Sequence, residues 1–103
     1  MTAVFEILAE PNRRRILEEL QSGELTVTEV VGRLDISQPA VSRHLKVLRE
    51  VGLVSVRVDK QRRRYRLRPE ALAEVDAWIE QFRPFWSERL DALKRHLDKE
   101  TAS

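Results

Sequence analysis

The apolar positions near the start of the chain recur at helical spacing and predict two short helices. Their apolar stripes are Val4, Phe5 and Leu8 in the first helix and Ile16, Leu17 and Leu20 in the second. Pro11 fits the first turn of the second helix, where its missing N–H leaves no hydrogen bond unmade. Gly23 is expected directly after this helix, at the position where glycine most often ends helices.

A second pair of helices, joined by a tight connection, is predicted after this glycine. Thr26 and Glu29 have the spacing of a capping box at the start of the first helix. Ser37 can cap the second helix, which tolerates Pro39 in its first turn and is expected to stop at Gly52. The apolar faces of the two helices consist of Val27, Val30, Val31 and Leu34, and of Val41, Leu45 and Leu48.

The segment after Gly52 alternates between apolar and polar residues, as a half-buried strand does. In "LVSVRV", one face carries Val54, Val56 and Val58, and the other face carries Ser55 and Arg57. Alternation resumes in "RRYRLR" after the polar "DKQR", so a β-hairpin is predicted over about residues 53–68. Because the connection is neither Asn-Gly nor Asp-Gly and contains no glycine, we expect a tip longer than a two-residue primed turn.

The last third of the chain has one continuous helical pattern. Its apolar positions, spaced three or four residues apart, are Leu72, Val75, Ile79, Phe82, Trp86, Leu90, Leu93 and Leu97. Pro84 interrupts the backbone hydrogen bonds of this segment, but the apolar phase continues across it. We therefore expect one helix over about residues 69–99, kinked near Phe82–Phe85.

Length and charge narrow the possibilities further. The 103 residues suffice for one domain with a modest core. Residues 33–68 contain eleven Arg or Lys against three Asp or Glu, whereas the segments on either side are net acidic. A basic centre between acidic ends suggests one face that binds a polyanion, although a solvated charged strip is the simpler alternative.

The predicted order of elements is that of a winged helix-turn-helix, a mainly α-helical fold with a small β-hairpin. In this fold the second helix of the pair enters the DNA major groove and its first turns meet the base edges. Gln38, Ser42 and Arg43 lie outside the apolar side of that helix and suit base contacts, whereas Lys46 and Arg49 suit phosphates. An ordinary solvated helix would not need the basic hairpin that follows, so we expect one winged helix-turn-helix domain that binds double-stranded DNA.

Three segments carry a family resemblance: "EPNRRRILEEL", "LTVTEVVGRLDISQPAVSRHLKVLREVGLV" and "DKQRRRYRL". Over about residues 3–97 the chain resembles the ArsR/SmtB family of bacterial winged-helix repressors. The resemblance implies a homodimeric repressor on an operator of imperfect two-fold symmetry, which effectors often release. It places base contacts at Gln38, Pro39, Ser42 and Arg43, with Pro39 standing where many members have Ser.

The expected site residues form two sets. Together, the recognition helix and the wing are expected to contact DNA through Ser37, Gln38, Pro39, Ser42, Arg43, His44, Lys46, Arg49, Arg62, Arg63 and Arg64. For His44, a structural role and a phosphate contact both remain open. Family members dimerise through the first and last helices, which implies an interface of Val4, Phe5, Leu8, Trp78, Ile79, Phe82, Phe85, Trp86, Leu90, Leu93 and Leu97.

The family's sensor residues are not recognisable. Thr26 and Thr28 stand where thiolate-using members carry Cys, and the chain has no cysteine. On the last helix, Trp78 stands two residues after Asp76, and the later ligand positions are Arg89 and Ala92. We therefore expect a member with no cofactor and with no metal or thiol sensor of the family type. His96 and Glu100, spaced i and i+4, could face one cation, but a surface ion pair is the simpler expectation.

Parts of the sequence are compatible with other functions. Trp78, Phe82, Phe85 and Trp86 could line a pocket for a small apolar ligand, although a dimer interface is the simpler expectation for them. A winged helix that binds only protein is a second alternative. An enzyme is not expected, because no nucleophile, base and phosphate-cradling loop can be brought together from this sequence. No stretch approaches a membrane span and the start lacks a secretion signal, so we expect a cytoplasmic protein.

Overall fold

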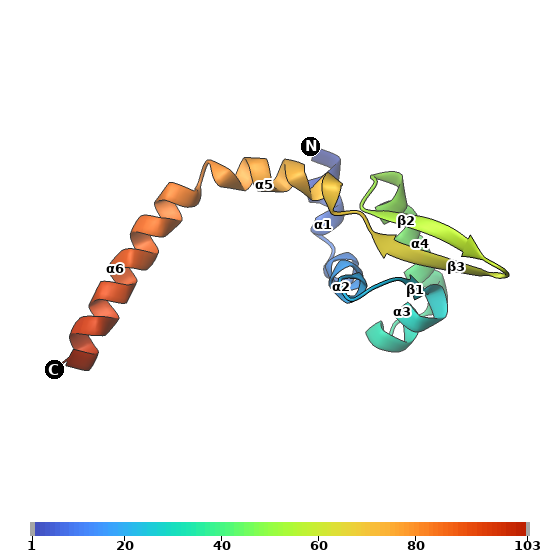
Figure 1. The fold of residues 1–103 in the computed structure, drawn as a ribbon, viewed down its shortest axis with the longest axis horizontal. Helices are drawn as coiled ribbons and strands as arrows, with labels where there is room; N and C mark the ends of the chain where they lie inside the picture. Colours follow the sequence, from blue (N-terminus) through green and yellow to red (C-terminus); the bar gives the residue numbers. More distant parts are fainter. Residues whose placement is uncertain (1, 103) are drawn as a thin grey trace.

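The computed structural model describes residues 2–102 and is mainly helical, with a small three-stranded sheet. Figure 1 shows the first four helices gathered beside the sheet, and the last helix extending away from them. The helices are α1 (Thr2–Leu8), α2 (Pro11–Leu20), α3 (Val27–Leu34), α4 (Gln38–Glu50), the 3-10 turn η1 (Pro69–Leu72), α5 (Ala73–Glu80) and α6 (Arg83–Ala102). The strands are β1 (Leu25–Thr26), β2 (Val54–Asp59) and β3 (Arg62–Leu67).

The core lies between helices α1 to α4 and one face of the sheet. It includes Ile16 of α2, Val30 of α3 and Leu45 of α4, all fully buried, together with Tyr65 of β3. Val4 of α1 is also in this core, with 6% of its surface exposed. The side chain of Val4, which was expected at a dimer interface, is thus already largely covered within its own chain.

The predicted helix caps are confirmed. The Thr26 hydroxyl accepts a hydrogen bond from the Glu29 N–H, and the Glu29 carboxylate accepts one from the Thr26 N–H, which completes the capping box of α3. The hydrogen bond from the backbone of Thr26 lowers the pKa of the Glu29 carboxyl. Ser37 caps α4 by accepting a hydrogen bond from the Ala40 N–H. Asp35, in the left-handed conformation, makes the tight connection between the two helices.

The end of α2 differs from the prediction at Gly23. The helix ends at Leu20 with Gln21 as its C-cap, so Gly23 lies one position later than expected. Its N–H donates to the Leu20 carbonyl at 3.2 Å, and its φ of 141° is one that L-residues rarely adopt. Glycine is therefore needed in the turn between α2 and β1, and not at the helix end itself.

The hairpin is confirmed, but its tip is shorter than predicted. Asp59 pairs with Arg62, so only Lys60 and Gln61 connect the strands. Lys60 adopts a φ of 61°, which supplies the positive angle that a two-residue hairpin turn needs without a glycine. The expected alternation also fails at the tip, since Val58 is 68% exposed where the hairpin extends beyond the core.

A third strand was missed by the sequence analysis. Leu25 and Thr26 pair with Tyr65 and Arg64, so the sheet has the order β1-β3-β2. With only two residues, β1 is too short to show an alternating pattern. It positions the start of α3 directly beside the hairpin.

The prediction of one kinked C-terminal helix is wrong. The segment forms η1 and α5, and after Gln81 and Phe82 the separate helix α6 begins. Pro84 cannot donate to the carbonyl four residues earlier, so the helical hydrogen bonds stop before it. Figure 1 shows the chain changing direction at this break.

Candidate nucleic-acid interface

Helix α4 presents a polar face opposite its buried side. Val41, Leu45 and Leu48 are each fully buried, which fixes the side of α4 that faces the core. On the remaining surface, five residues expected to contact DNA are exposed: Gln38, Ser42, Arg43, Lys46 and Arg49. Pro39, in the first turn, is exposed as well, whereas the hydroxyl of Ser37 is already engaged in capping. The structure therefore places most of the predicted recognition residues together on one accessible face.

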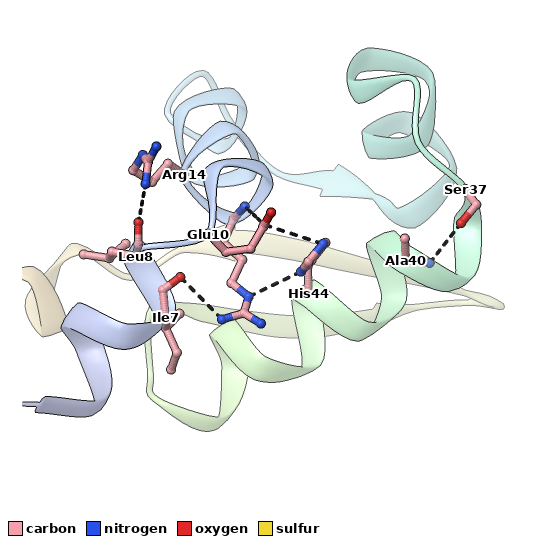
Figure 2. A network of polar contacts seen from close by, with 8 residues as sticks. Ile7, Leu8, Glu10, Arg14, Ser37, Ala40 and His44 are labelled. Atoms are coloured by element: carbon pink, nitrogen blue, oxygen red, sulfur yellow. Dashed lines mark hydrogen bonds and ion pairs between the residues drawn. The ribbon is translucent and has the colours of Figure 1, made fainter.

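His44 lies apart from this face. Its side chain is largely buried against α2, and Figure 2 shows it directed toward Glu10 rather than outward. Its Nδ1 accepts a hydrogen bond from Arg13 Nε at 3.3 Å, and its Nε2 lies 3.7 Å from Glu10 Oε2. Sequence reasoning missed Arg13 and Glu10, because nothing in the spacing of α2 links these residues to α4. The boundary position of His44 beside Leu45 was the one available signal.

The arginines of the wing, the hairpin β2–β3, lie in different surroundings. Arg62 and Arg63 are exposed at the tip, whereas Arg64 Nε donates to Asp59 Oδ2 at 3.0 Å. Side chains alternate along β3, so Arg62 and Arg64 lie on one face of the sheet. Arg63 lies on the other face, paired across the hairpin with Val58. Of the three arginines predicted at the tip, Arg64 is the one held by a carboxylate.

A second ion pair joins the wing to the rest of the domain. Arg57 Nη2 donates to Glu24 Oε2 at 2.8 Å, which links β2 to the turn before β1. The hydrogen bond from Arg57 lowers the pKa of the Glu24 carboxyl, and the same contact raises the pKa of the Arg57 guanidinium. Because the Arg57 side chain is exposed, this pair adds little to the stability of the wing.

An open cavity of about 440 Å³ separates the first turn of α3 from the wing tip. Its lining consists of Thr26, Val27, Thr28, Glu29, Gln61, Arg62 and Arg63. Thr26 and Thr28 occupy the positions where the resemblance places thiolate ligands in other members. The Thr26 hydroxyl is committed to the capping box, and neither hydroxyl is a competitive ligand for a soft metal ion.

The residues expected at a dimer interface divide into two groups. Phe5, Leu8 and Ile79 are half-buried in the domain. The Phe5 and Trp78 rings meet edge to face at 5.3 Å, and Phe82 lies 4.8 Å from Trp78. The α6 residues remain largely in solvent, with at least 48% exposure at Phe85, Trp86, Leu90, Leu93 and Leu97. The four aromatic residues considered for a pocket, Trp78, Phe82, Phe85 and Trp86, are thus divided by the break between α5 and α6.

Three further features of the structure concern a possible metal site and a possible membrane span. The His96 and Glu100 side chains form an exposed ion pair, with Nε2 and Oε1 3.0 Å apart. In the described residues, no cluster of three or more His, Asp or Glu could hold a metal ion. Within the same residues, no helix is both long and apolar enough to cross a membrane.

The arrangement of α3, α4 and the wing defines a winged helix-turn-helix domain. Comparison with known proteins gives the family. The profile described as "Bacterial regulatory protein, arsR family" matches residues 10–56. The HTH-type transcriptional regulator Rv2034 of Mycobacterium tuberculosis is 38% identical over 93% of this chain and 87% of its own. The arsenical resistance operon repressor of Escherichia coli (strain K12) is 37% identical over 97% and 86%.

A solved structure is also similar to this chain in sequence and in fold. A possible transcriptional regulator for arsenical resistance is 45% identical and superposes with a TM-score of 0.67, covering 85% of this chain and 88% of the other. The chain belongs to the ArsR family of bacterial regulatory proteins. It is a DNA-binding transcriptional regulator of the repressor type, not an enzyme.

Proposed function

We propose that this regulator is a homodimer that represses transcription by reading a pseudo-palindromic operator through α4. One observation carries the proposal: the accessible face of α4 is polar and basic, and it lies opposite a fully buried apolar side. A helix fixed in this way can present the same side chains to a major groove in every molecule. The basic wing beside it supplies contacts to the DNA backbone.

The exposed side chains divide by chemistry into readers and anchors. Gln38, Ser42 and Arg43 carry groups that can pair with base edges, Gln with adenine and Arg with guanine. Phosphate contacts come from Lys46 and Arg49 on α4 and from Arg62 and Arg63 on the wing, which position the protein without specifying sequence. Because Arg64 is bound to Asp59, its role is to hold the wing rather than to anchor the backbone.

The dimer uses α6 as its main contact, and a second copy of the chain is the proposed occupant of its apolar stripe. This helix has 20 residues and carries Leu90 at 63% and Leu93 at 54% exposure. An apolar stripe of this kind on a soluble protein marks an interaction surface. In a two-fold dimer, the two α4 helices would meet half-sites about 34–36 Å apart, or a multiple of that distance.

Release of this protein from DNA is not expected to use a metal site built from cysteine thiolates. The chain has no cysteine, and Thr26 and Thr28 occupy the corresponding positions. We therefore propose that no soft metal ion acts through the start of α3, even though the Escherichia coli relative is named for arsenical resistance. The protein works in the cytoplasm, where its operator lies.

The test is binding of the purified protein to the DNA upstream of its own gene and to a shuffled duplex of the same composition. Fluorescence anisotropy should show a large preference for the upstream duplex. The double variant Gln38→Ala/Arg43→Ala should lose that preference while it keeps weak binding to both duplexes. If the wild-type protein bound both duplexes weakly and equally, the result would favour a winged helix that contacts only protein.

A further inference from the structure

The recognition helix is joined to α2 by a polar contact that uses both nitrogens of one imidazole. Arg13 Nε donates to His44 Nδ1 at 3.3 Å, and Glu10 Oε2 lies 3.7 Å from His44 Nε2. The same Glu10 oxygen accepts the Arg13 backbone N–H at 3.1 Å, as the cap of α2. The contact is thus built into the first turn of α2, and Figure 2 shows Glu10 and His44 facing each other across the two helices.

Arg13 also reaches α1. Its Nη1 donates to the Ile7 carbonyl at 3.5 Å, so one guanidinium links α1, α2 and α4. The neighbouring Arg14 donates to the Leu8 carbonyl at 2.6 Å and is exposed. Figure 2 shows Arg14 directed to α1 and away from α4. The two arginines therefore carry the same charge on the same turn, but only Arg13 contacts the recognition helix.

The contact assigns a hydrogen-bonding role to each nitrogen of the imidazole. Because Nδ1 accepts the hydrogen bond from Arg13, we place the ring proton on Nε2, which faces Glu10. Protonation of Nδ1 would place an N–H against the Arg13 N–H and break the bond. Glu10, the N-cap of α2, and Arg13 of α2 face the ring, and the Ile7 carbonyl of α1 accepts a hydrogen bond from the same Arg13 guanidinium.

We propose that His44 and Arg13 are positioning residues for sequence reading, and that neither needs to touch DNA. The inference rests on the proposed function. The apolar contacts of Val41, Leu45 and Leu48 hold α4 against the core but are not directional. A hydrogen bond is directional, and the one from Arg13 restrains rotation of α4 about its axis. That rotation decides where Ser42 and Arg43, the residues just before His44, meet the base edges.

The experiment compares Arg13→Gln with its matched control Arg14→Gln, which removes the same charge one residue away. Arg13→Gln should lower the preference for the upstream duplex about tenfold, the effect of losing one hydrogen bond to a charged group, whereas Arg14→Gln should leave it within about twofold. His44→Asn keeps an acceptor near the Nδ1 position for the Arg13 guanidinium, so this variant should retain most of the preference.

A measurement on the free protein tests the contact itself. Long-range ¹⁵N NMR of the His44 ring at about pH 8 should show the proton on Nε2, and a proton on Nδ1 would overturn the proposal. Equal preferences for the Arg13→Gln and Arg14→Gln variants, with a wild-type protein that prefers the upstream duplex, would refute this inference alone. A wild-type protein without any preference would refute the proposed function, and this inference with it.

Discussion

Two neighbouring arginines of the wing carry the same charge, but one is unpaired by any described carboxylate and the other is bound to one. Comparing them tests which arginine contacts the DNA backbone and which one holds the wing. Arg63 is exposed, and no carboxylate within residues 2–102 forms an ion pair with it. Arg64 is bound to Asp59 at 3.0 Å. We expect Arg63→Ala to weaken binding to all duplexes equally and to flatten its salt dependence, since a phosphate contact carries no sequence information.

The magnitude follows from counterion release. Each neutralised phosphate contributes about 0.9 to the slope of log affinity against log salt, so losing Arg63 from both wings of a dimer should reduce the slope by about 1.8. Between about 50 and 200 mM salt, this corresponds to about a tenfold smaller loss of affinity. Arg64→Ala should change the slope much less. The double variant Asp59→Ala/Arg64→Ala, which removes the pair without changing net charge, should have the wild-type slope.

The assay is fluorescence anisotropy with the upstream duplex and a shuffled duplex over a salt series. Circular dichroism of each variant confirms that the domain remains folded. An equal decrease of slope in Arg63→Ala and Arg64→Ala would refute the reasoning, because it would mean that the Asp59 pair does not keep Arg64 from the backbone. A loss of sequence preference in Arg63→Ala would also contradict it.

Four further predictions concern stability and assembly. Leu45→Ala, at a fully buried position of α4, should lower the free energy of unfolding by about 2–5 kcal/mol in urea titrations, and a smaller loss would indicate that the core closes around the cavity. Thr26→Ala should lower the same free energy by about 1 kcal/mol through the lost cap. The pKa of Glu29 is lowered in the folded protein, so the ionised carboxylate stabilises the fold above the ordinary pKa of 4.5, and this stabilisation is lost as the pH falls through the lowered pKa. Glu29→Gln should therefore reduce the loss of thermal stability at acid pH. An unchanged acid sensitivity in thermal melts would contradict this prediction. Leu90→Glu should shift the protein from dimer to monomer in sedimentation experiments, whereas Ala92→Glu, turned to the other side of α6, should not.

Local chemistry explains why much of the domain was predictable from the sequence. Caps need specific side chains at fixed offsets, so Thr26 with Glu29, and Ser37, located the starts of α3 and α4 correctly. The apolar spacing of Val41 and Leu45 likewise identified the buried side of α4, and therefore its accessible side.

The incorrect predictions concern the wing tip, the C-terminal helix and Val58, where backbone geometry or tertiary contacts determine the structure. Lys60 adopts a positive φ, which is uncommon for a lysine and cannot be recognised from the sequence. The wing tip was therefore predicted to be longer than it is. The continuous apolar phase across Pro84 reflects two different environments, because residues before the break pack on the domain and those after it remain exposed. Val58 follows the strand pattern, but the core ends before the tip of the wing.

The sequence predicted which residues of α4 are exposed at the candidate site, but it did not predict the hydrogen bonds that hold α4 and the wing in place. The exposed face of α4 follows from periodicity, whereas the Arg13–His44 and Arg64–Asp59 contacts depend on how separate segments fold together. Arg13 and His44 are 31 residues apart in the sequence. No local pattern relates two side chains across such a separation.

The central claim is that a dimer of this chain reads DNA sequence through α4, and selection from a random duplex library tests it most directly. The wild-type protein should enrich an inverted repeat whose half-site centres lie about 34–36 Å apart, or a multiple of that distance. The Arg43→Ala variant should enrich a repeat with relaxed preference at one base pair in each half-site. Recovery of a library with no enriched sequence, under conditions in which the wild-type protein binds DNA, would contradict the claim.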